Sequence, residues 1–442
     1  MTEKIHADLM IKGGTVLTMT DGRPIENGAV ALNGDTIVFV GTDRDAAGRC
    51  TAEKQIDASG CVVMPGLVNG HTHAAMSLFR GIADDLPLEQ WLSDYIFPAE
   101  KNNLDDDFVY WGTKLACAEM LLGGVTTFCD MYLFEESAAR AAKEMGMRGV
   151  LGEVLYDFDS PNYGPIDNGF AYTEAFIKKW KDDPLIVPSI QPHALDTCSP
   201  DLLVRAREIS DTYGVRSIVH VAESKGNVAH VREKYGKSSF AYLDDLGVLN
   251  ERFVAIHAVW VDAEEIGIMH DRGVSVVTNP ESNMKLASGW APMHNYLERG
   301  ITVGIGTDGC ASNNDLDLFG EMDTLAKLHK VYDADPTHMN ARTVTEIATR
   351  KGACALGLGD ITGTLATGKK ADIIVIDFNK PHLTPVYNPY SHLVYAAKSA
   401  DVRDVVVNGQ LLVQNARLTK ADPAEIMAKG RELAERVNKS IG

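Results

Sequence analysis

Short apolar runs alternate with segments of helical periodicity through the middle of the chain. Apolar runs of about four to eight residues are typical of strands buried on both faces, and their alternation with helices indicates βα units around a parallel sheet. The runs lie at residues 62–67, 125–129, 149–155, 185–191, 217–221, 253–257, 274–278 and 302–306. Eight repeats over roughly 300 residues favour a closed (β/α)8 TIM barrel over an open sheet.

Helix boundary signals occur between these runs. Ser199, followed by a proline, predicts the start of one helix, and Gly214 predicts its end. Asp262 begins a capping-box pattern ahead of a second helix that should stop at Gly273. The residues at 422–425 combine an N-cap, a proline and a capping glutamate, and they predict a charged helix at the end of the chain.

The two ends of the chain are β-rich and differ from the middle. The β-rich segments are residues 7–18, 29–40, 371–377 and 405–413. Asn-Gly pairs at 33–34 and 408–409 predict two-residue hairpin turns. We therefore expect a small composite β-sandwich domain from residues 1–61 and 367–442, which includes the C-terminal helix, and a barrel domain from residues 62–366.

Composition and charge narrow the range of partners. The chain has 442 residues, of which 45% are hydrophobic, so it can form one large domain with a smaller companion. With 42 basic and 61 acidic residues the formal charge is -19, which disfavours binding to nucleic acid or to an anionic membrane. The start of the chain lacks the apolar core of a signal peptide and no apolar run could span a bilayer, so we expect a cytoplasmic location. The seven cysteines are scattered and form no Cys-x-x-Cys pair, which argues against a disulfide framework or a thiolate zinc site.

Polar residues follow the predicted strands at the end where such barrels place their chemistry. Strand exits supply His71, His73, His193, His220, Glu223, His257 and Asp308. His71 and His73 lie two residues apart in an extended segment, so both imidazoles can face the same point. A single histidine at a strand end is more often structural than functional. Five histidines and one aspartate at one face of a barrel indicate a metal site.

Three neutral imidazoles and one carboxylate suit Zn²⁺ or Fe²⁺ and leave room for a water molecule, whose pKa such a metal lowers toward neutrality. We assign the ligands as His71, His73, His220 and Asp308. We expect one divalent transition metal per subunit, with Zn²⁺ as the first expectation and Fe²⁺ or Mn²⁺ as alternatives. Asp308 can also accept a proton from the water, Glu223 can carry a proton to the substrate, and His257 can orient the water.

These motifs resemble those of a known superfamily. The segment at 65–73, His220 with Glu223, His257 and the segment at 306–309 resemble the amidohydrolase superfamily in its mononuclear deaminase branch. The resemblance covers nearly the whole chain, and residues 368–372 are similar to the return into the small β-domain of that superfamily. It implies a metal-dependent hydrolase. The exit of the fourth strand offers no lysine, whereas related barrel hydrolases with two metals carry a bridging lysine there, which implies a mononuclear site.

Two further segments narrow the resemblance. Residues 78–92 and 308–317 are similar to 5'-methylthioadenosine/S-adenosylhomocysteine deaminases. The resemblance implies hydrolysis of the adenine 6-amino group to give an inosine derivative and ammonia. It also implies that Glu100 holds the ribose hydroxyls and that His193 contacts the substrate, together with Glu223 and Asp308. Trp91 is expected either to wall the purine or simply to pack in a lid.

One departure from the family pattern concerns the substrate. Where an arginine is expected after the third strand, to hold the amino-acid carboxylate of S-adenosylhomocysteine, this chain has Glu153, and Arg148 offers only a weak substitute. The choice among 5'-methylthioadenosine, S-adenosylhomocysteine and adenosine therefore stays open.

Alternative functions for this chain are those of a guanine or cytosine deaminase, a triazine hydrolase and, more remotely, a non-catalytic scaffold. The partner expected is a small purine nucleoside. The helix-rich insert at 83–107 is compatible with a lid or with a contact in a homo-oligomer.

Overall fold

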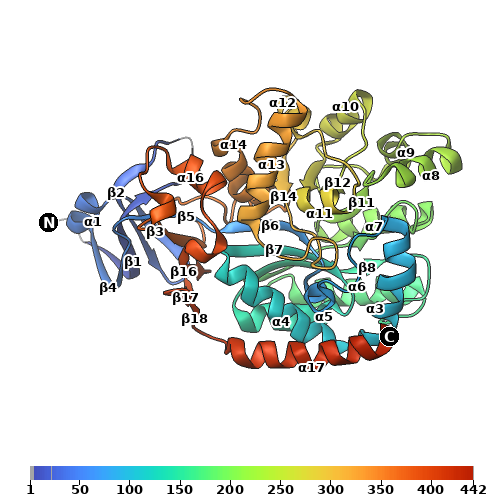
Figure 1. Ribbon diagram of the computed structural model, residues 1–442, viewed down its shortest axis with the longest axis horizontal. Coiled ribbons are helices and arrows are strands. Elements are labelled where there is room, and N and C mark those ends of the chain that lie inside the picture. Colours follow the sequence, from blue (N-terminus) through green and yellow to red (C-terminus); the bar gives the residue numbers. More distant parts are fainter. Residues whose placement is uncertain (1–3, 21, 442) are drawn as a thin grey trace.

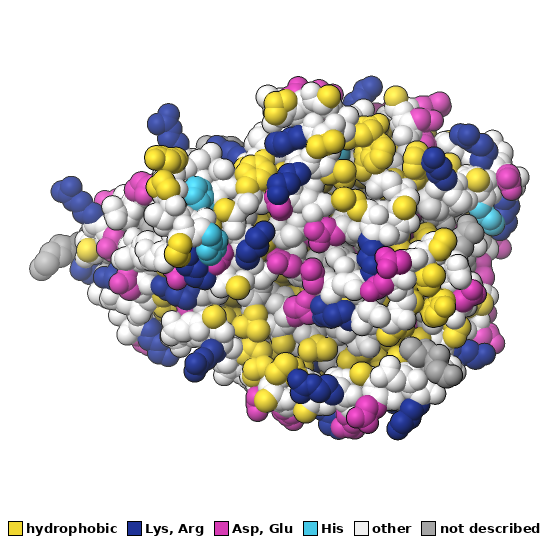
Figure 2. Space-filling view, viewed as in Figure 1, with side chains coloured by type: hydrophobic (Ala, Val, Ile, Leu, Met, Phe, Trp, Pro, Cys, Tyr) yellow, Lys and Arg dark blue, Asp and Glu magenta, His cyan; other side chains and the backbone are white. Residues whose placement is uncertain are grey.

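The structure is a computed structural model that describes residues 4–20 and 22–441. Residues 1–3, on which the expectation about the start of the chain partly rests, and residue 442, the last of the expected small domain, lie outside the described part. Figure 1 shows a β-rich body built from both chain ends on the left and a larger body of strands and helices on the right. On the face drawn in Figure 2, acidic and basic side chains are interspersed. None of the described helices combines the length and the hydropathy that a bilayer-spanning helix needs.

The larger body is a parallel barrel. In the described part of the chain its strands are β6 (Leu67–Thr72), β7 (Val125–Tyr132), β8 (Arg148–Leu155), β9 (Ile186–Pro188) continued by β10 (Gln191–Pro192), β11 (Ser217–Val221), β12 (Phe253–His257), β13 (Ser275–Thr278) and β14 (Val303–Ile305). They pair in two parallel groups, β6 to β10 and β11 to β14. A parallel bridge between Ile190 and Ser217 joins the groups on one side. On the other side the backbone N–H of Asp308 donates to His71 O over 3.0 Å, so the expected barrel is confirmed.

Helices cover the outside of the barrel or pack over the ends of its strands. They are α4 (Asp106–Leu122), α5 (Glu135–Met145), α6 (Ile166–Trp180), α7 (Pro200–Tyr213), α8 (Lys225–Tyr235), α9 (Ser239–Asp245), α10 (Ala263–Arg272), α11 (Pro280–Lys285), α12 (Met293–Glu298), α13 (Leu318–Tyr332), α14 (Ala341–Glu346), the π-helical turn η3 (Ile347–Lys351) and α15 (Gly352–Ala355). The predicted ends of two helices are confirmed. Ser199 caps α7 and Asp262 caps α10 with its side chain, and left-handed Gly214 and Gly273 end them.

The smaller body is one sheet made from both ends of the chain. Nine strands of the described residues form it: β1 (Ile5–Val16), β2 (Ile25–Asn33), β3 (Thr36–Thr42), β4 (Cys50–Asp57), β5 (Cys61–Pro65), β15 (Ile373–Asp377), β16 (Val402–Val407), β17 (Gln410–Gln414) and β18 (Arg417–Leu418). Ile37 of β3 and Val406 of β16 share a buried cluster although they are far apart in the strand order. A Cβ on Gly409, in the β16–β17 turn, would lie 2.0 Å from Gly34 O. The sheet therefore curls until its ends meet, which gives it the character of a sandwich.

The short elements of this body are α1 (Asp43–Arg49), η4 (Pro381–Leu383), α16 (Pro389–Tyr395) and η5 (Ser399–Asp401). The predicted turn at Asn408 and Gly409 is confirmed, because Val407 pairs with Gln410. The turn predicted at Asn33 and Gly34 is displaced by one residue, since Asn33 pairs with Thr36.

The predicted bounds of the first barrel strand, residues 62–67, are wrong. Cys61–Pro65 forms β5, which pairs with β1 and β15 in the small sheet, and the barrel strand β6 begins at Leu67. Both strands are buried on both faces, so one continuous apolar run covers them and hides the break between them. The pairing therefore favours a boundary near Gly66 rather than at residue 62.

The C-terminal helix α17 (Pro423–Ile441) runs along the barrel rather than along the small sheet (Figure 1). Arg436 Nη1 lies 2.8 Å from Asp105 Oδ2, and Asn103 Nδ2 donates to Ser440 Oγ over 2.7 Å. These contacts join the helix to α3 (Phe97–Asn103) and α4, and they favour its assignment to the barrel domain.

Candidate metal centre and active site

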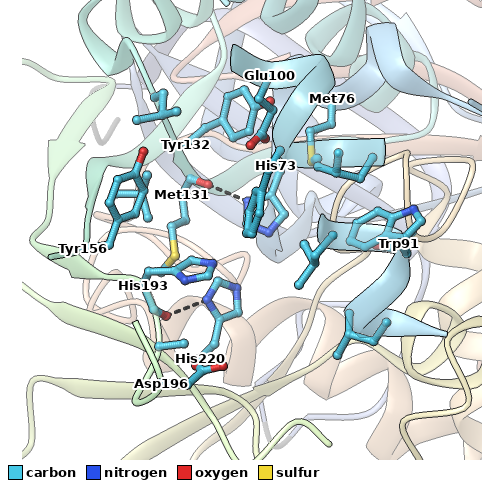
Figure 3. Close-up of a pocket in the computed structure, with 18 of the residues that line it drawn as sticks. His73, Met76, Trp91, Glu100, Met131, Tyr132, Tyr156, His193, Asp196 and His220 are labelled. Carbon is cyan, nitrogen blue, oxygen red and sulfur yellow. Dashed lines mark hydrogen bonds between the residues drawn. The ribbon is translucent and has the colours of Figure 1, made fainter. Parts of the chain in front are cut away.

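The carboxyl ends of the barrel strands surround a cavity of about 430 Å³. This volume suits a nucleoside-sized ligand. Its inner end is lined by His73, His220, His257, Asp308 and Glu223, all of them residues that the sequence placed at strand exits. Figure 3 shows this pocket, with Tyr156 and Trp91 on opposite sides of it.

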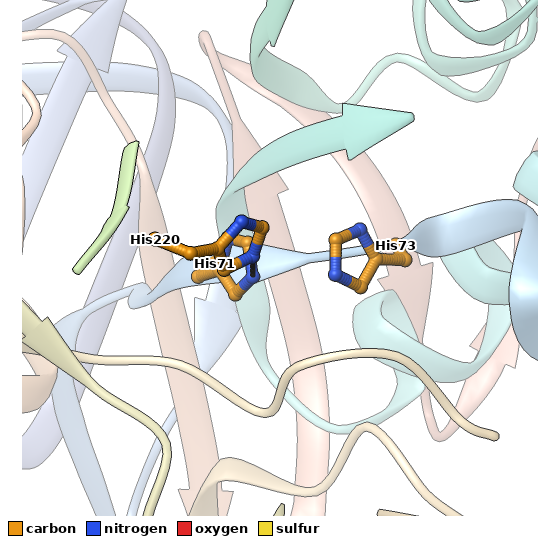
Figure 4. A group of neighbouring side chains, drawn as sticks. All are labelled: His71, His73 and His220. Carbon is orange, nitrogen blue, oxygen red and sulfur yellow. Dashed lines mark hydrogen bonds between the residues drawn. The ribbon is translucent and has the colours of Figure 1, made fainter. Parts of the chain in front are cut away.

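Three imidazoles converge at the inner end of the cavity (Figure 4), and the carboxylate of Asp308 lies beside them. One ring nitrogen each of His71, His73 and His220 lies within 4.8 Å of the others. The Nε2 atoms of His71 and His220 are 3.1 Å apart. Asp308 Oδ1 lies 3.5 Å from His71 Nε2 and 3.2 Å from His73 Nε2. Ligand atoms of this kind and at this proximity are the donor set of a mononuclear zinc-type site.

Backbone carbonyls fix two of these rings. His73 Nδ1 lies 2.5 Å from Met131 O and His220 Nδ1 lies 2.7 Å from His193 O, so each Nδ1 carries the hydrogen and donates it. In the neutral form of each ring the lone pair is then on Nε2, the atom that faces the other ligands. Metal-binding histidines are held in this way by an outer hydrogen bond. The residues present therefore fit a divalent metal.

Asp308 is held in place by its backbone and by neighbours that the sequence did not reveal. Its φ is 63°, an uncommon value for a non-glycine residue that is often found at functional sites. Ser282 Oγ and Ser312 Oγ donate to Oδ2 over 2.7 and 3.1 Å, which orients the carboxylate. Burial opposes the charge, but hydrogen bonds with His71 and His73 hold the pKa of Asp308 well below its ordinary value.

The close approach of β14 to β6 explains the glycine two residues before Asp308. A Cβ on Gly306 would lie 2.6 Å from His71 N. Only glycine lets the two strands come this close, and their contact brings Asp308 beside the histidine ligands.

His257 and Glu223 lie side by side next to the ligand cluster. His257 Nδ1 is 2.9 Å from Asn283 Oδ1, and its Nε2 is 3.8 Å from Glu223 Oε2. Burial raises the pKa of Glu223. A carboxyl group with a raised pKa can hold a proton near neutral pH, as a proton carrier must. Asn283, a residue that sequence reasoning missed, orients the His257 ring.

Glu100 reaches the cavity from α3. Tyr132 Oη donates to Glu100 Oε1 over 2.8 Å. Burial raises the pKa of Glu100 to about 7, although the hydrogen bond from Tyr132 opposes the shift. Sequence reasoning missed Tyr132, although its position as the last residue of β7 is a strand exit and was the available signal.

The model of the amidohydrolase family matches residues 62–412. The chain belongs to the amidohydrolase family. It is 54% identical over 433 residues to the 5-methylthioadenosine/S-adenosylhomocysteine deaminase of Syntrophobacter fumaroxidans, which covers 98% of this chain and 99% of that protein. It is also 43% identical over 432 residues to the 5'-deoxyadenosine deaminase of Methanosarcina mazei, covering 97% of this chain and 98% of the relative.

A solved structure agrees with the fold of this amidohydrolase. The adenosine deaminase from Xanthomonas campestris with bound zinc superimposes with a TM-score of 0.97 at 38% sequence identity, and the match covers 99% of this chain and 100% of that one. The protein described here is therefore a metal-dependent hydrolase.

His193 and Trp91 of this amidohydrolase both line the cavity. His193 Nδ1 lies 2.8 Å from Thr197 Oγ1, and burial lowers the pKa of His193 to about 4, so its ring is neutral. Trp91 begins the π-helical segment η2 (Trp91–Ile96), which follows α2 (Leu88–Gln90), and only 6% of it is exposed. The insert at 83–107 therefore contributes part of the cavity wall.

Glu153 lies on the outer side of its strand, contrary to the idea that it takes the place of a substrate-binding arginine. Its carboxylate accepts hydrogen bonds from the backbone N–H groups of Phe134 and Glu135, at 3.2 and 2.9 Å, and thereby caps the start of α5. The next residues that face the cavity are Val154 and Tyr156. The identity of residue 153 consequently does not bear directly on the choice of substrate.

Arg148 is also not a substitute for that arginine. It lies at the first position of β8, at the opposite end of the barrel from the cavity, and it is 1% exposed. Its Nε donates to Asp372 Oδ2 over 2.9 Å, which joins the barrel to the small domain. Arg148 therefore has a structural role.

Proposed function

We propose that this protein hydrolyses the 6-amino group of a 5'-substituted adenosine, in particular an adenosine thioether such as 5'-methylthioadenosine, and releases ammonia and the inosine analogue. The observation that carries the proposal is the presence, in one cavity, of the metal-binding cluster with Glu223 beside it and of Glu100 paired with Tyr132. The first group suits attack on an amidine carbon and the second suits recognition of sugar hydroxyls. The high identity to a relative that is named for this activity supports the proposal.

The metal proposed is Zn²⁺, held by His71, His73, His220 and Asp308. When bound, such a metal supplies a Lewis acid that makes water nucleophilic near neutral pH. Zinc is favoured because three imidazoles and a carboxylate suit it and because the Xanthomonas campestris structure holds zinc. The same ligands also accept Fe²⁺ or Mn²⁺.

The side chains around the metal site orient the water and carry out the proton transfers of the reaction. Asp308 accepts a proton from the attacking water, and His257 orients that water toward C6 of the purine. Glu223 donates a proton to N1 as the new C6–O bond forms. The C6–N bond then breaks, and the amino group leaves as ammonia after it takes up the proton that the water gave to Asp308. The hydroxyl group now on C6 returns its proton to Glu223, which leaves the C6 carbonyl of the inosine analogue. General acid and base groups of this kind each contribute about 10²–10⁴-fold to a rate.

The outer part of the cavity binds the nucleoside. Glu100 accepts hydrogen bonds from the two ribose hydroxyls, and Tyr132 fixes the orientation of its carboxylate. The neutral ring of His193 contacts the substrate next to His220, and Trp91 walls the cavity on the side of the insert. A carboxylate placed for two hydroxyl donors favours a ribonucleoside over a free base or a triazine.

Ammonia release from a substrate panel tests the proposal. The panel contains 5'-methylthioadenosine, S-adenosylhomocysteine, 5'-deoxyadenosine, adenosine, guanine, cytosine and a chlorotriazine, and the zinc-loaded protein is used. We expect kcat/KM to be highest for a 5'-modified adenosine. Turnover restricted to guanine, cytosine or the triazine would replace this function with one of the alternatives. If the zinc-loaded protein is inactive on the whole panel, a function as a non-catalytic scaffold would be favoured. The cytoplasmic location and a homo-oligomeric state stay predictions.

A further inference from the structure

The mouth of the cavity has a feature that the deamination chemistry does not use. It is formed by α3 on one side and by the loop after β8 on the other. Phe97 and Lys101 are four residues apart in α3 and so share one face of the helix. Phe158 and Asp159 are adjacent in the loop, and all four residues line the cavity. The two phenylalanine rings are tilted by 59° to each other with centroids 6.5 Å apart, so the mouth has an aromatic centre flanked by a cation and an anion.

The two charged side chains of the mouth have no hydrogen-bond or ion-pair partner among the residues that the structure describes. Lys101 is the one lysine or arginine among the described residues that line the cavity. Both Lys101 and Asp159 are exposed, and neither side chain makes a hydrogen bond or ion pair with another of the residues described in this structure. No ion pair joins them, so each remains available to a group that enters between them.

We propose that Lys101 and Asp159 form a subsite for a 5'-substituent that carries an amino acid, with Lys101 binding its carboxylate and Asp159 its ammonium group. This inference rests on the proposed deamination of 5'-substituted adenosines. Glu100, which we assign to the ribose hydroxyls, directly precedes Lys101. A substituent on the 5' carbon of that ribose therefore lies next to the mouth. Opposite charges held apart complement a zwitterion, because each end of the zwitterion meets the opposite charge.

The aromatic part of the mouth suits the chain between the ribose and the amino acid. Tyr156 and Phe158 stack with centroids 3.9 Å apart and an interplanar angle of 12°. Phe97 is 39% and Phe158 47% exposed, which leaves apolar surface for a ligand to cover. A thioether sulfur and its methylene groups make favourable contacts with aromatic rings. Since Glu153 and Arg148 both lie away from the cavity, the carboxylate of such a substituent has no other described cation to meet there.

The test compares two substrates that differ at the 5' end. The variants are Lys101→Gln and Asp159→Asn, and the substrates are S-adenosylhomocysteine and 5'-methylthioadenosine. Each variant should lower kcat/KM for S-adenosylhomocysteine by about tenfold, as expected from the loss of one hydrogen-bonded charge pair. The value for 5'-methylthioadenosine, which has neither charged group, should change by less than about twofold. Lys181→Gln and Asp182→Asn, at exposed positions remote from the cavity, are matched controls for the change in net charge.

A third substrate separates the two charges. An adenosine with a 3-aminopropylthio group at the 5' position has the ammonium group but no carboxylate. Its kcat/KM should fall in Asp159→Asn and stay unchanged in Lys101→Gln. If S-adenosylhomocysteine is not a substrate, or if its kcat/KM is unaffected by both variants or falls together with that of 5'-methylthioadenosine, the subsite is wrong while the deamination proposal stands. A zinc-loaded wild-type protein that turns over none of the three substrates overturns the deamination proposal itself.

Discussion

The Nε2 atoms of His71 and His220 lie 3.1 Å apart at the inner end of the cavity. Burial lowers the pKa of His71 to about 4 and that of His220 well below its ordinary value, so both rings are neutral at pH 7. The Nδ1 atom of His220 donates to a carbonyl, which leaves the lone pair on Nε2. Two neutral imidazoles aimed at the same point, next to a buried carboxylate, are an arrangement that a divalent cation stabilises.

Removal of the metal should abolish turnover and lower the thermal stability of the protein. A ligand that binds only the folded state at 100 times its dissociation constant stabilises that state by about 2.7 kcal/mol. Dialysis against a chelator, with metal content followed by elemental analysis, should lower the Tm, and added Zn²⁺ should restore the Tm and the activity. Asp308→Ala should bind less metal than the wild type. Full activity in protein shown to be metal-free would contradict the assigned ligand set.

Substitution of Glu223 should separate metal binding from chemistry. Glu223→Gln keeps the size of the side chain but cannot donate the proton, so kcat should fall by about 10²–10⁴-fold while the zinc content stays the same. Glu298→Gln, at an exposed position on α12, serves as the matched control and should keep the wild-type kcat. If Glu223→Gln retains near-normal kcat, another group carries the proton.

The affinity for ribonucleosides should depend on pH through Glu100. Burial raises the pKa of this carboxyl from 4.5 to about 7. Below about pH 7 it is protonated and accepts hydroxyl donors poorly, so KM should fall as the pH rises through about 7. Glu100→Gln should remove this dependence of KM while the pH profile of kcat is kept. A KM that is independent of pH in the wild type would show that Glu100 does not bind the hydroxyls as a carboxylate.

The raised pKa of Glu100 also makes the stability of the protein depend on pH. A rise in pH improves the binding of ribonucleosides but lowers the stability. Between about pH 4.5 and 7 the folded protein keeps a proton on Glu100 that the unfolded chain has lost. The contribution of Glu100 to the free energy of unfolding therefore falls as the pH rises through this window and is constant above it. Thermal unfolding of the wild type and of Glu100→Gln across this range provides an independent measure of the shift.

Glu153→Gln should reduce stability without changing substrate preference. The carboxylate accepts hydrogen bonds from two backbone N–H groups at the start of α5 and from Asn162 Nδ2 at 2.8 Å, and the amide can satisfy these donors only in part. We expect a loss of about 1–2 kcal/mol in the free energy of unfolding, measured with denaturant. The ratio of kcat/KM for S-adenosylhomocysteine and 5'-methylthioadenosine should equal that of the wild type. A changed ratio would mean that residue 153 influences the cavity after all.

The sequence predicted the residues of the candidate site because they follow strands whose carboxyl ends meet in the barrel. His220 and Asp308 are examples, since each comes after a clear apolar run. The direction of a side chain at a strand exit was harder to predict. Tyr132 is the last residue of β7 and Glu153 lies two residues before the end of β8, yet Glu153 faces a helix and Tyr132 faces the cavity. Side chains alternate between the two faces of a strand, so a shift of one residue would exchange these two orientations. A run of apolar residues does not show which of them face the cavity.

Residues that orient the ligands left no pattern in the sequence. Ser282 and Ser312 contact Asp308, but they lie in α11 and in the loop before α13, where a serine is ordinary. Their function depends on how these segments fold back over the strand ends, which is a property of tertiary packing rather than of local sequence. The break between β5 and β6 was hidden for a similar reason, because both strands are fully buried.

The buried ion pair of Arg148 and Asp372 should hold the small domain to the barrel. Arg148 Nε lies 2.9 Å from Asp372 Oδ2, and each residue is 1% exposed. Arg148→Met leaves the carboxylate buried without its partner and should cost about 3–5 kcal/mol in the free energy of unfolding. The double variant Arg148→Met with Asp372→Leu removes both charges and should recover part of that loss. Strictly additive losses in the double-mutant cycle would show that the pair is not coupled. Because the pair lies at the opposite end of the barrel from the cavity, the folded Arg148→Met protein should keep the wild-type zinc content, which separates loss of stability from damage to the metal site.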